Sequence, residues 1–314
     1  MKTSLRQLTY FIAAAEHGSA SRAAAAINVS QPSISTAIRD LEIVFGQPLF
    51  HRLYAKGLSL TPFGQRKLHE ARSLIEDAKG FEYGISYASS ESILGAVAFG
   101  YFTALGPSHV PAILRYTRNR HPELTVDMSN CNLEQISERL RDGRMEMALT
   151  YDVGITGSIT RETLAEFEPY AVVPEGHTLA KQDAISLADM AKEPFVLIDL
   201  PLSREFLLTP FWQHGLEPDV HHLVDSVEMV RAMVANGHGV SLLITRPHNT
   251  LEHNRAHDGR PLISRPLKEK VARQKLIAAY TSTHPPTRAA NALLGCMKNY
   301  FATEETPLRT SSAI

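Results

Sequence analysis

The chain opens with apolar residues at helical spacing. Leu5, Leu8 and Phe11 recur every three residues, which predicts one buried face of an amphipathic helix. A second, alanine-rich helix is predicted to begin after Ser19 or Ser21, because serine is a common residue just before a helix. The start of the chain therefore predicts two short helices in close contact.

A third helix is predicted after Ser30, with Pro32 in its first turn, where a missing N–H costs little. Its apolar residues fall on one arc: Ile34, Ile38, Leu41 and Phe45. The opposite arc holds small polar residues and one cation, with no carboxylate: Pro32, Ser33, Ser35, Thr36 and Arg39. A polar arc without Glu/Lys pairs suits insertion into the DNA major groove better than an ordinary solvent-facing role.

Two short extended pieces follow the third helix. They flank a basic turn at Lys56-Gly57, which predicts a wing, and Thr61-Pro62 then begins a new helix. Arg52 and Lys56 are placed to reach backbone phosphate or the minor groove. Residues 1–66 carry seven basic and three acidic groups, although the whole chain has a net charge of −1, so a basic module precedes a larger acidic one.

Several consecutive segments resemble the winged helix-turn-helix of LysR-type transcriptional regulators. They are Gly18 to Ala24, Val29 to Ser35, Gly46 to Arg52 and Leu60 to Gly64. The resemblance implies that residues of the third helix from Gln31 onward face the bases and that Arg52 serves the wing. The side chains expected at DNA are Ser21, Gln31, Pro32, Ser33, Ser35, Thr36, Arg39, Arg52 and Lys56.

A long helix is predicted from Pro62 to about Ser90. Apolar residues at 4-3-4-3 spacing form a seam along it: Leu74, Ala78, Phe81, Ile85 and Ala88. This seam either packs on its own domain or, as the resemblance implies, joins two copies of the chain. The serines between 86 and 92 predict a hinge into the next domain.

The remainder alternates short apolar runs with amphipathic helices, which predicts an α/β architecture with parallel sheets. Two such sets form two lobes, with crossings near Tyr151–Arg161 and Leu267–Arg273. The resemblance implies a periplasmic-binding-protein-like effector domain. The expected division is a winged helix-turn-helix domain at 1–61, a linker helix at 62–91, an effector domain at 92–303 and a tail at 304–314. Lobe I would take about 92–160 and 268–303, and lobe II about 161–267.

Ligands of open α/β sheets bind beyond the carboxyl ends of the strands. Hydroxyl groups at helix starts, beside free N–H groups, favour a carboxylate or similar anion. We therefore expect an anionic effector in a cleft lined by Thr103, Asn130, Cys131, Thr150, Tyr151 and Ser203. The resemblance places effector contacts at positions such as Thr103 and Ser203. Each residue is also explained as a plain helix cap, because caps use the same residue types.

Other chemistry finds little support in the sequence. His248, His253 and His257 share a polar loop without a carboxylate or cysteine to complete a metal set, so we expect no metal and no cofactor. Cys131 and Cys296 could form a redox switch, but the sequence offers no basic residue beside Cys131 to lower its thiol pKa. Phosphate-loop and nucleophile-elbow motifs are absent, which argues against an enzyme.

The expected location is the cytoplasm. Two cysteines in 314 residues exclude a disulfide-rich secreted scaffold, and the longest uncharged stretch, 92–114, contains glycines and prolines unsuited to a membrane span. A faint signal-peptide pattern near the start keeps secretion as an alternative.

The favoured function is a DNA-binding regulator controlled by a small-molecule effector. The resemblance implies a homodimer or homotetramer on an inverted-repeat operator in double-stranded DNA, with RNA polymerase as a further partner and no membrane. One alternative is an exported solute-binding protein with a fortuitous helical N-terminus. Another is a two-lobed enzyme, for which we find no catalytic constellation.

Overall fold

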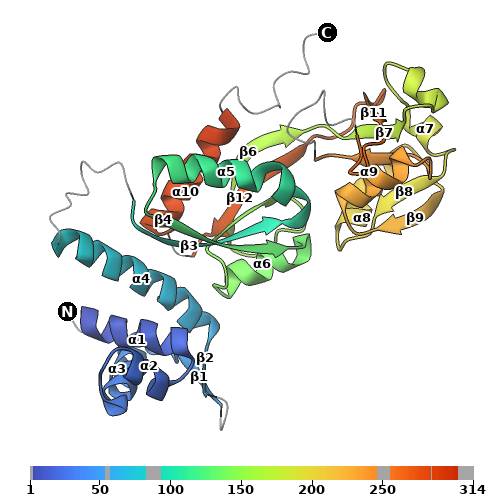
Figure 1. Cartoon of the computed structure of the whole chain (residues 1–314). Helices are drawn as coiled ribbons and strands as arrows, with labels where there is room; N and C mark the ends of the chain where they lie inside the picture. The colour runs from blue at the N-terminus through green and yellow to red at the C-terminus, as the bar shows by residue number, and fades with distance from the viewer. Residues whose placement is uncertain (1–2, 54–56, 83–92, 246–254, 284, 303–314) are drawn as a thin grey trace.

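The computed structural model describes residues 3–53, 57–82, 93–245, 255–283 and 285–302 (Figure 1). The N-terminal part consists of three helices, a hairpin and a long helix: α1 (Leu5–His17), α2 (Ala20–Ala26), α3 (Gln31–Phe45), β1 (Phe50–Leu53), β2 (Gly57–Leu60) and α4 (Pro62–Glu82). Ser19 and Ser30 cap α2 and α3 through their side chains. Gly18 and Gly46 end α1 and α3 in the left-handed conformation, which glycine adopts without strain. The predicted helices are confirmed.

The apolar arc of α3 closes the core of this domain. Ile34 and Leu41 are fully buried together with Phe11 of α1 and Leu49 of the following loop. The start of α4 joins the same core, and a side chain at Gly64 would clash with the carbonyl oxygen of Leu49. One face of α3 is therefore held by packing, and the other is left to solvent.

Helix α4 is described from Pro62 to Glu82, within the range that the sequence predicts. The predicted seam residues Ile85 and Ala88, like the predicted hinge, lie outside the described residues. Leu74 of the seam is 53% exposed. The seam is thus not covered by its own domain at Leu74.

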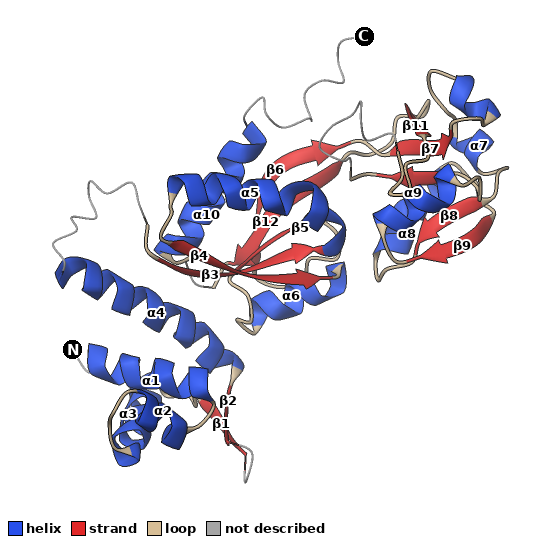
Figure 2. Ribbon diagram, in the orientation of Figure 1, coloured by secondary structure: helices blue, strands red, loops and turns tan. Residues whose placement is uncertain are grey.

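A five-stranded sheet forms the first lobe of the larger part, in the order β4-β3-β5-β12-β6. Its strands are β3 (Gly95–Phe102), β4 (Leu124–Cys131), β5 (Met147–Tyr151), β6 (Ile159–Phe167) and β12 (Gln274–Thr281). Helices α5 (Gly106–Arg120) and α10 (Arg288–Ala302) cover one face, and α6 (Leu133–Arg141) covers the other (Figure 2). We call this unit lobe I.

The second lobe, lobe II, combines antiparallel and parallel strands. Strands β10 (Ser241–Leu243), β7 (Tyr170–Pro174) and β11 (Leu262–Pro266) are antiparallel, and β8 (Phe195–Ile198) and β9 (Val220–Val224) are parallel. A bridge between Phe195 and Val240 connects the two groups. The lobe also contains α7 (Leu187–Met190), α8 (Ser203–Gln213), α9 (Val227–Ala235) and a 3-10 turn at Thr178–Lys181.

The prediction of purely parallel sheets is wrong. Strands β3, β4 and β5 are parallel, but β12 runs antiparallel to both β5 and β6. The chain enters lobe II between Phe167 and Tyr170 and returns between Pro266 and Gln274. The first crossing therefore comes later than Tyr151–Arg161, because β6 still belongs to lobe I. The middle of β6 consists of partly buried and exposed residues, several of them charged, as is typical of an edge strand. The sequence therefore contains no continuous apolar run that would indicate a strand here.

Candidate DNA-binding surface and ligand pocket

The polar arc of α3 faces solvent. Gln31, Pro32, Thr36 and Arg39 are exposed, while Ser33 and Ser35 are partly buried. Ser21 on α2 is also exposed. The Ser33 hydroxyl lies 2.8 Å from that of Ser30, so part of its hydrogen-bonding capacity is used within the cap.

The hairpin β1–β2 is anchored to the turn between α1 and α2. The Leu58 N–H donates to the carbonyl of Gly18 at 2.9 Å, which fixes the hairpin to the turn between α1 and α2. Arg52 lies in β1 opposite Leu58, and its side chain is outside the described residues, as is Lys56 altogether. The backbone thus forms the predicted wing.

The three acidic residues within positions 1–66 all have partners within the protein. Glu42 accepts the N–H of Leu49 at 2.9 Å, and Glu16 accepts from Arg72 at 2.9 Å. Asp40 accepts from the side chain of Gln7 at 3.4 Å. The residue count predicts the excess of positive charge but not these bonds within the protein. Because the three carboxylates bond inside the protein, none of them competes with DNA phosphate at the exposed arc.

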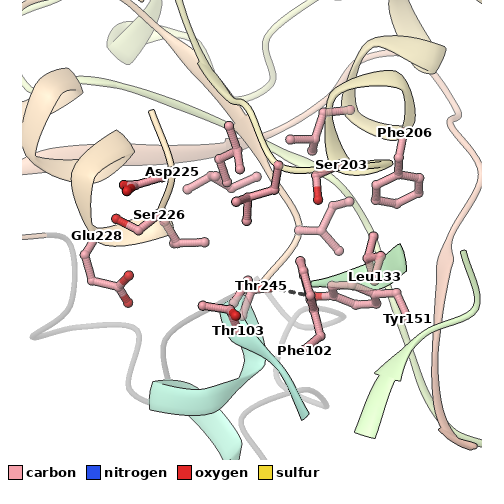
Figure 3. Close-up of a pocket in the computed structure, with 17 residues that line it drawn as sticks. Phe102, Thr103, Leu133, Tyr151, Ser203, Phe206, Asp225, Ser226, Glu228 and Thr245 are labelled. Atoms are coloured by element: carbon pink, nitrogen blue, oxygen red, sulfur yellow. Dashed lines mark hydrogen bonds between the residues drawn. The ribbon is translucent and has the colours of Figure 1, made fainter. Parts of the chain in front are cut away.

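A pocket, partly open to solvent, lies between the two lobes (Figure 3). It sits beyond the carboxyl ends of β3, β5 and β8, as expected for an open α/β sheet. Its lining is Phe102, Thr103, Ala104, Leu133, Tyr151, Ile198, Leu200, Ser203, Phe206, Leu207, Asp225, Ser226, Val227, Glu228, Leu243, Ile244 and Thr245.

Three of the six predicted cleft residues line this pocket: Thr103, Tyr151 and Ser203. The other three lie outside the lining. Thr150 is fully buried on the alternate side of β5, and Asn130 is exposed on β4. The carbonyl of Cys131 accepts the hydroxyl of Thr103 at 3.2 Å, which places Cys131 behind the pocket wall.

Two hydroxyl groups in the pocket have contrasting surroundings. The Tyr151 hydroxyl is 2.6 Å from that of Thr245, and burial raises the pKa of Tyr151 far above its ordinary value, so it stays neutral. The Ser203 side chain is 5% exposed, and its hydroxyl has no hydrogen-bond partner among the described residues. A buried unpaired hydroxyl is costly, and a ligand would satisfy it.

Four polar lining residues were not among the sequence-predicted cleft residues: Asp225, Ser226, Glu228 and Thr245. Asp225 and Ser226 directly follow β9, and Thr245 closely follows β10. The rule that ligands bind beyond strand ends could therefore have found them.

Cys131 does have a basic neighbour, contrary to the sequence analysis. Arg139, two turns further along the chain on α6, places Nη1 3.3 Å from the Cys131 sulfur. Burial nevertheless raises the pKa of the Cys131 thiol, with Arg139 only partly opposing it. Burial likewise raises the pKa of the Cys296 thiol. Both groups are therefore poor sources of thiolate.

Helix α6 connects the pocket with the N-terminal part. Leu133, its first residue, lines the pocket. Near its other end, the carbonyl of Arg141 accepts from Arg66 Nη1 at 3.1 Å, and the carbonyl of Gly143 accepts from His69 Nε2 at 3.0 Å. Arg66 and His69 both belong to α4, so one helix contacts both functional regions.

Within the described residues, no group of three or more histidine, cysteine, aspartate or glutamate side chains could hold a metal ion. Of the three histidines of the predicted polar loop, His248 and His253 lie outside that part of the chain. Among the described helices, none is both long and apolar enough to cross a membrane.

The fold and its two sites define a winged helix-turn-helix DNA-binding protein with a two-lobed ligand-binding domain. Residues 5–65 match the family described as "Bacterial regulatory helix-turn-helix protein, lysR family". Residues 90–302 match the "LysR substrate binding domain". The chain belongs to the LysR family of transcriptional regulators, and it has the family's DNA-binding and effector-binding domains. This is a family of regulators and not of enzymes.

Curated relatives and a solved structure agree with this assignment. The regulator CysL of Bacillus subtilis is 30% identical over 246 residues, which cover 75% of this chain and 79% of the relative. The dual regulator OxyR of Escherichia coli is 27% identical over 256 residues, covering 81% and 82%. The crystal structure of HinK, a LysR family regulator from Pseudomonas aeruginosa, is 32% identical with a TM-score of 0.61 and covers 94% of this chain and 98% of that one.

Proposed function

We propose that the exposed arc of α3 reads base edges in the major groove while the wing contacts phosphate. The observation that carries this is an arc bearing hydroxyls, an amide and Arg39 on the solvent side of α3, opposite an apolar arc whose Ile34, Ile38 and Leu41 are buried. Hydroxyl and amide groups match base-edge donors and acceptors, and cations supply affinity for phosphate. The proposed contact residues are Ser21, Gln31, Pro32, Ser33, Ser35, Thr36, Arg39, Arg52 and Lys56.

We further propose that a small molecule in the pocket alters DNA binding through α6. The pocket is lined from both lobes, so a ligand binds best to one arrangement of them. A displacement at Leu133 would pass along α6 to the carbonyls that hold Arg66 and His69 of α4. Helix α4 begins directly after the wing, so its orientation sets that of α3. Thr103, Tyr151 and Ser203 are the proposed contacts from the sequence-predicted set.

The proposed assembly is a homodimer or homotetramer on an inverted repeat, in the cytoplasm, with RNA polymerase as a further partner. Leu74 of α4 supports this, because an apolar side chain that is 53% exposed on a helix seam gains from burial against a second copy. Two copies would place two reading helices at half-sites one or more turns apart.

Electrophoretic mobility shift with the full chain tests this function. Binding to a duplex of random sequence should be detectable at low salt and weaken steeply as salt rises, because phosphate contacts release counterions. A purified, folded chain that binds no duplex at low salt would contradict the proposal and favour the solute-binding alternative.

A further inference from the structure

The pocket wall away from its mouth is largely apolar and aromatic. Tyr151 contacts Phe102 edge-on at 5.9 Å between ring centroids and stacks with Phe206 at 6.4 Å. Figure 3 shows Tyr151 and Phe206 on one side of the cavity and the acidic residues on the other. Such a wall accommodates an aromatic or aliphatic body, and ring faces also attract cations.

The polar groups of the pocket are mainly acceptors. The hydroxyl hydrogen of Thr103 is donated to the Cys131 carbonyl, so this oxygen presents only lone pairs to a ligand. Ser203 directs its unpaired hydroxyl into the cavity (Figure 3). Asp225 and Glu228 lie at the mouth, exposed and without a cationic partner among the described residues.

The helix starts around the pocket have part of their hydrogen-bonding capacity occupied. The N–H groups of Ser203 and Arg204 at the start of α8 both point to the carbonyl of Leu200, at 2.9 and 3.4 Å. At the start of α9, the Ser226 hydroxyl accepts the N–H of Met229 at 3.2 Å, and Glu228 places its own negative charge in the first turn. An anion at the start of α9 would therefore be repelled by a carboxylate in that turn.

No described lining residue carries a positive charge. A carboxylate effector, expected from the sequence, would therefore enter beside Asp225 and Glu228 with no cation among the described lining residues to balance it. A positively charged ligand meets the opposite situation, with two carboxylates at the mouth, acceptor oxygens inside and ring faces behind them.

We propose that the pocket binds a small organic amine in its ammonium form, with an aromatic or aliphatic body. This rests on the proposed function, in which this same pocket takes the effector. The ammonium group lies toward Asp225 and Glu228, where it donates hydrogen bonds. The body packs against Phe102, Tyr151 and Phe206.

Three probes with one skeleton test this inference: phenethylamine, 2-phenylethanol and phenylacetate. They differ in charge at neutral pH but share a phenyl ring and a two-carbon arm. Isothermal titration with the full chain should show phenethylamine binding at least about fivefold more tightly than 2-phenylethanol, since a charge pair near the surface contributes on the order of 1 kcal/mol. Phenylacetate should bind most weakly.

Variants test whether the preference for phenethylamine comes from Asp225 and Glu228 at the pocket mouth. Asp225→Asn combined with Glu228→Gln should remove the advantage of phenethylamine over 2-phenylethanol, with little effect on the alcohol. Glu217→Gln, which neutralises an exposed carboxylate outside the lining, should leave the preference intact. Ser203→Ala should weaken the alcohol and the amine together.

Tightest binding by phenylacetate, or no binding of phenethylamine up to about 10 mM, overturns the inference. A mobility shift on the same preparation separates this failure from failure of the proposed function. If the chain still binds DNA but prefers phenylacetate, only the proposal of an amine ligand is contradicted. Loss of DNA binding by the unmodified chain contradicts the regulator proposal, whatever the probes do.

Discussion

The DNA-binding surface and the ligand pocket are built in opposite ways. The surface comes mainly from one helix of 15 residues, whose buried and exposed arcs follow from its own sequence period. The pocket takes its lining from both lobes, from Phe102 to Thr245. The first is basic and polar, and the second is apolar with an acidic mouth. A local pattern thus suffices to find one site, while the other depends on contacts that form only after the lobes fold.

The largest expected effect concerns the buried arc of α3. Ile34→Ala should destabilise the N-terminal domain by about 2–5 kcal/mol, because it leaves a cavity in a fully buried site. Thermal unfolding and mobility shift should show loss of that domain's transition and of DNA binding. Ile43→Ala is the matched control, because Ile43 is on the same helix and 72% exposed. Equal destabilisation by both variants would contradict the division of α3 into two arcs.

The exposed arc should separate specificity from affinity. Ser35→Ala should relax base preference by about 1–3 kcal/mol at one position, because it removes a base-edge contact. Arg39→Ala should weaken binding to all duplexes and reduce the steepness of the salt dependence by about one phosphate contact. Binding titrations over salt and over a set of single-base operator variants measure both. The assignment fails if Arg39→Ala alters base preference and leaves the salt slope unchanged.

Loss of the contact between α4 and α6 should weaken the coupling between ligand binding and DNA binding more than it weakens either binding event alone. Arg66→Ala removes the bond to the Arg141 carbonyl. We expect the ligand-induced change in DNA affinity to fall by about fivefold, which corresponds to about 1 kcal/mol of coupling. Titrations of DNA with and without phenethylamine measure this, and Arg118→Ala, an exposed arginine on α5, is the control. Undiminished coupling in Arg66→Ala would contradict a route through α6.

The smallest expected effect is a loss of stability at alkaline pH. Burial raises the pKa of Tyr300 to about 12 and also raises the pKa values of Tyr151, Cys131 and Cys296. The unfolded chain releases these protons first, near pH 8.5 for cysteine and about 10 for tyrosine, so stability falls as pH rises above those values. Urea unfolding at pH about 7.5 and about 10.5 tests this, and Tyr300→Phe should reduce the difference. Greater stability at the higher pH would show that the sign is wrong.

The raised pKa values of the two thiols also affect how readily the cysteines of this chain could react with peroxide. "Hydrogen peroxide-inducible genes activator" is the name of several relatives at 27% identity. Peroxide chemistry at cysteine needs thiolate and access, and both cysteines of this chain are buried with raised pKa values.

Helix periodicity predicted the N-terminal domain closely, because Ser19, Ser30 and Gly18 end or begin helices through local bonds. It did not predict β6 or β11, whose pairing partners lie far along the chain and whose residues are mostly partly or fully exposed, without a buried apolar run. In the pocket, Thr103, Tyr151 and Ser203 were found by the strand-end rule. The charge of the lining was not predicted: Asp225 directly follows β9 and is open to the same rule, whereas Glu228 lies inside α9, where the rule does not apply.

The most direct test of DNA recognition by α3 compares two equal substitutions in one domain. Thr36 and Thr9 are both exposed helical threonines, on α3 and α1 respectively. Fluorescence anisotropy with a labelled duplex should show Thr36→Glu weakening binding by more than about tenfold, because a carboxylate would face phosphate and base acceptors. Thr9→Glu should change affinity by less than about threefold. Equal losses in the two variants, or unchanged binding by Thr36→Glu, would contradict the role of the α3 surface.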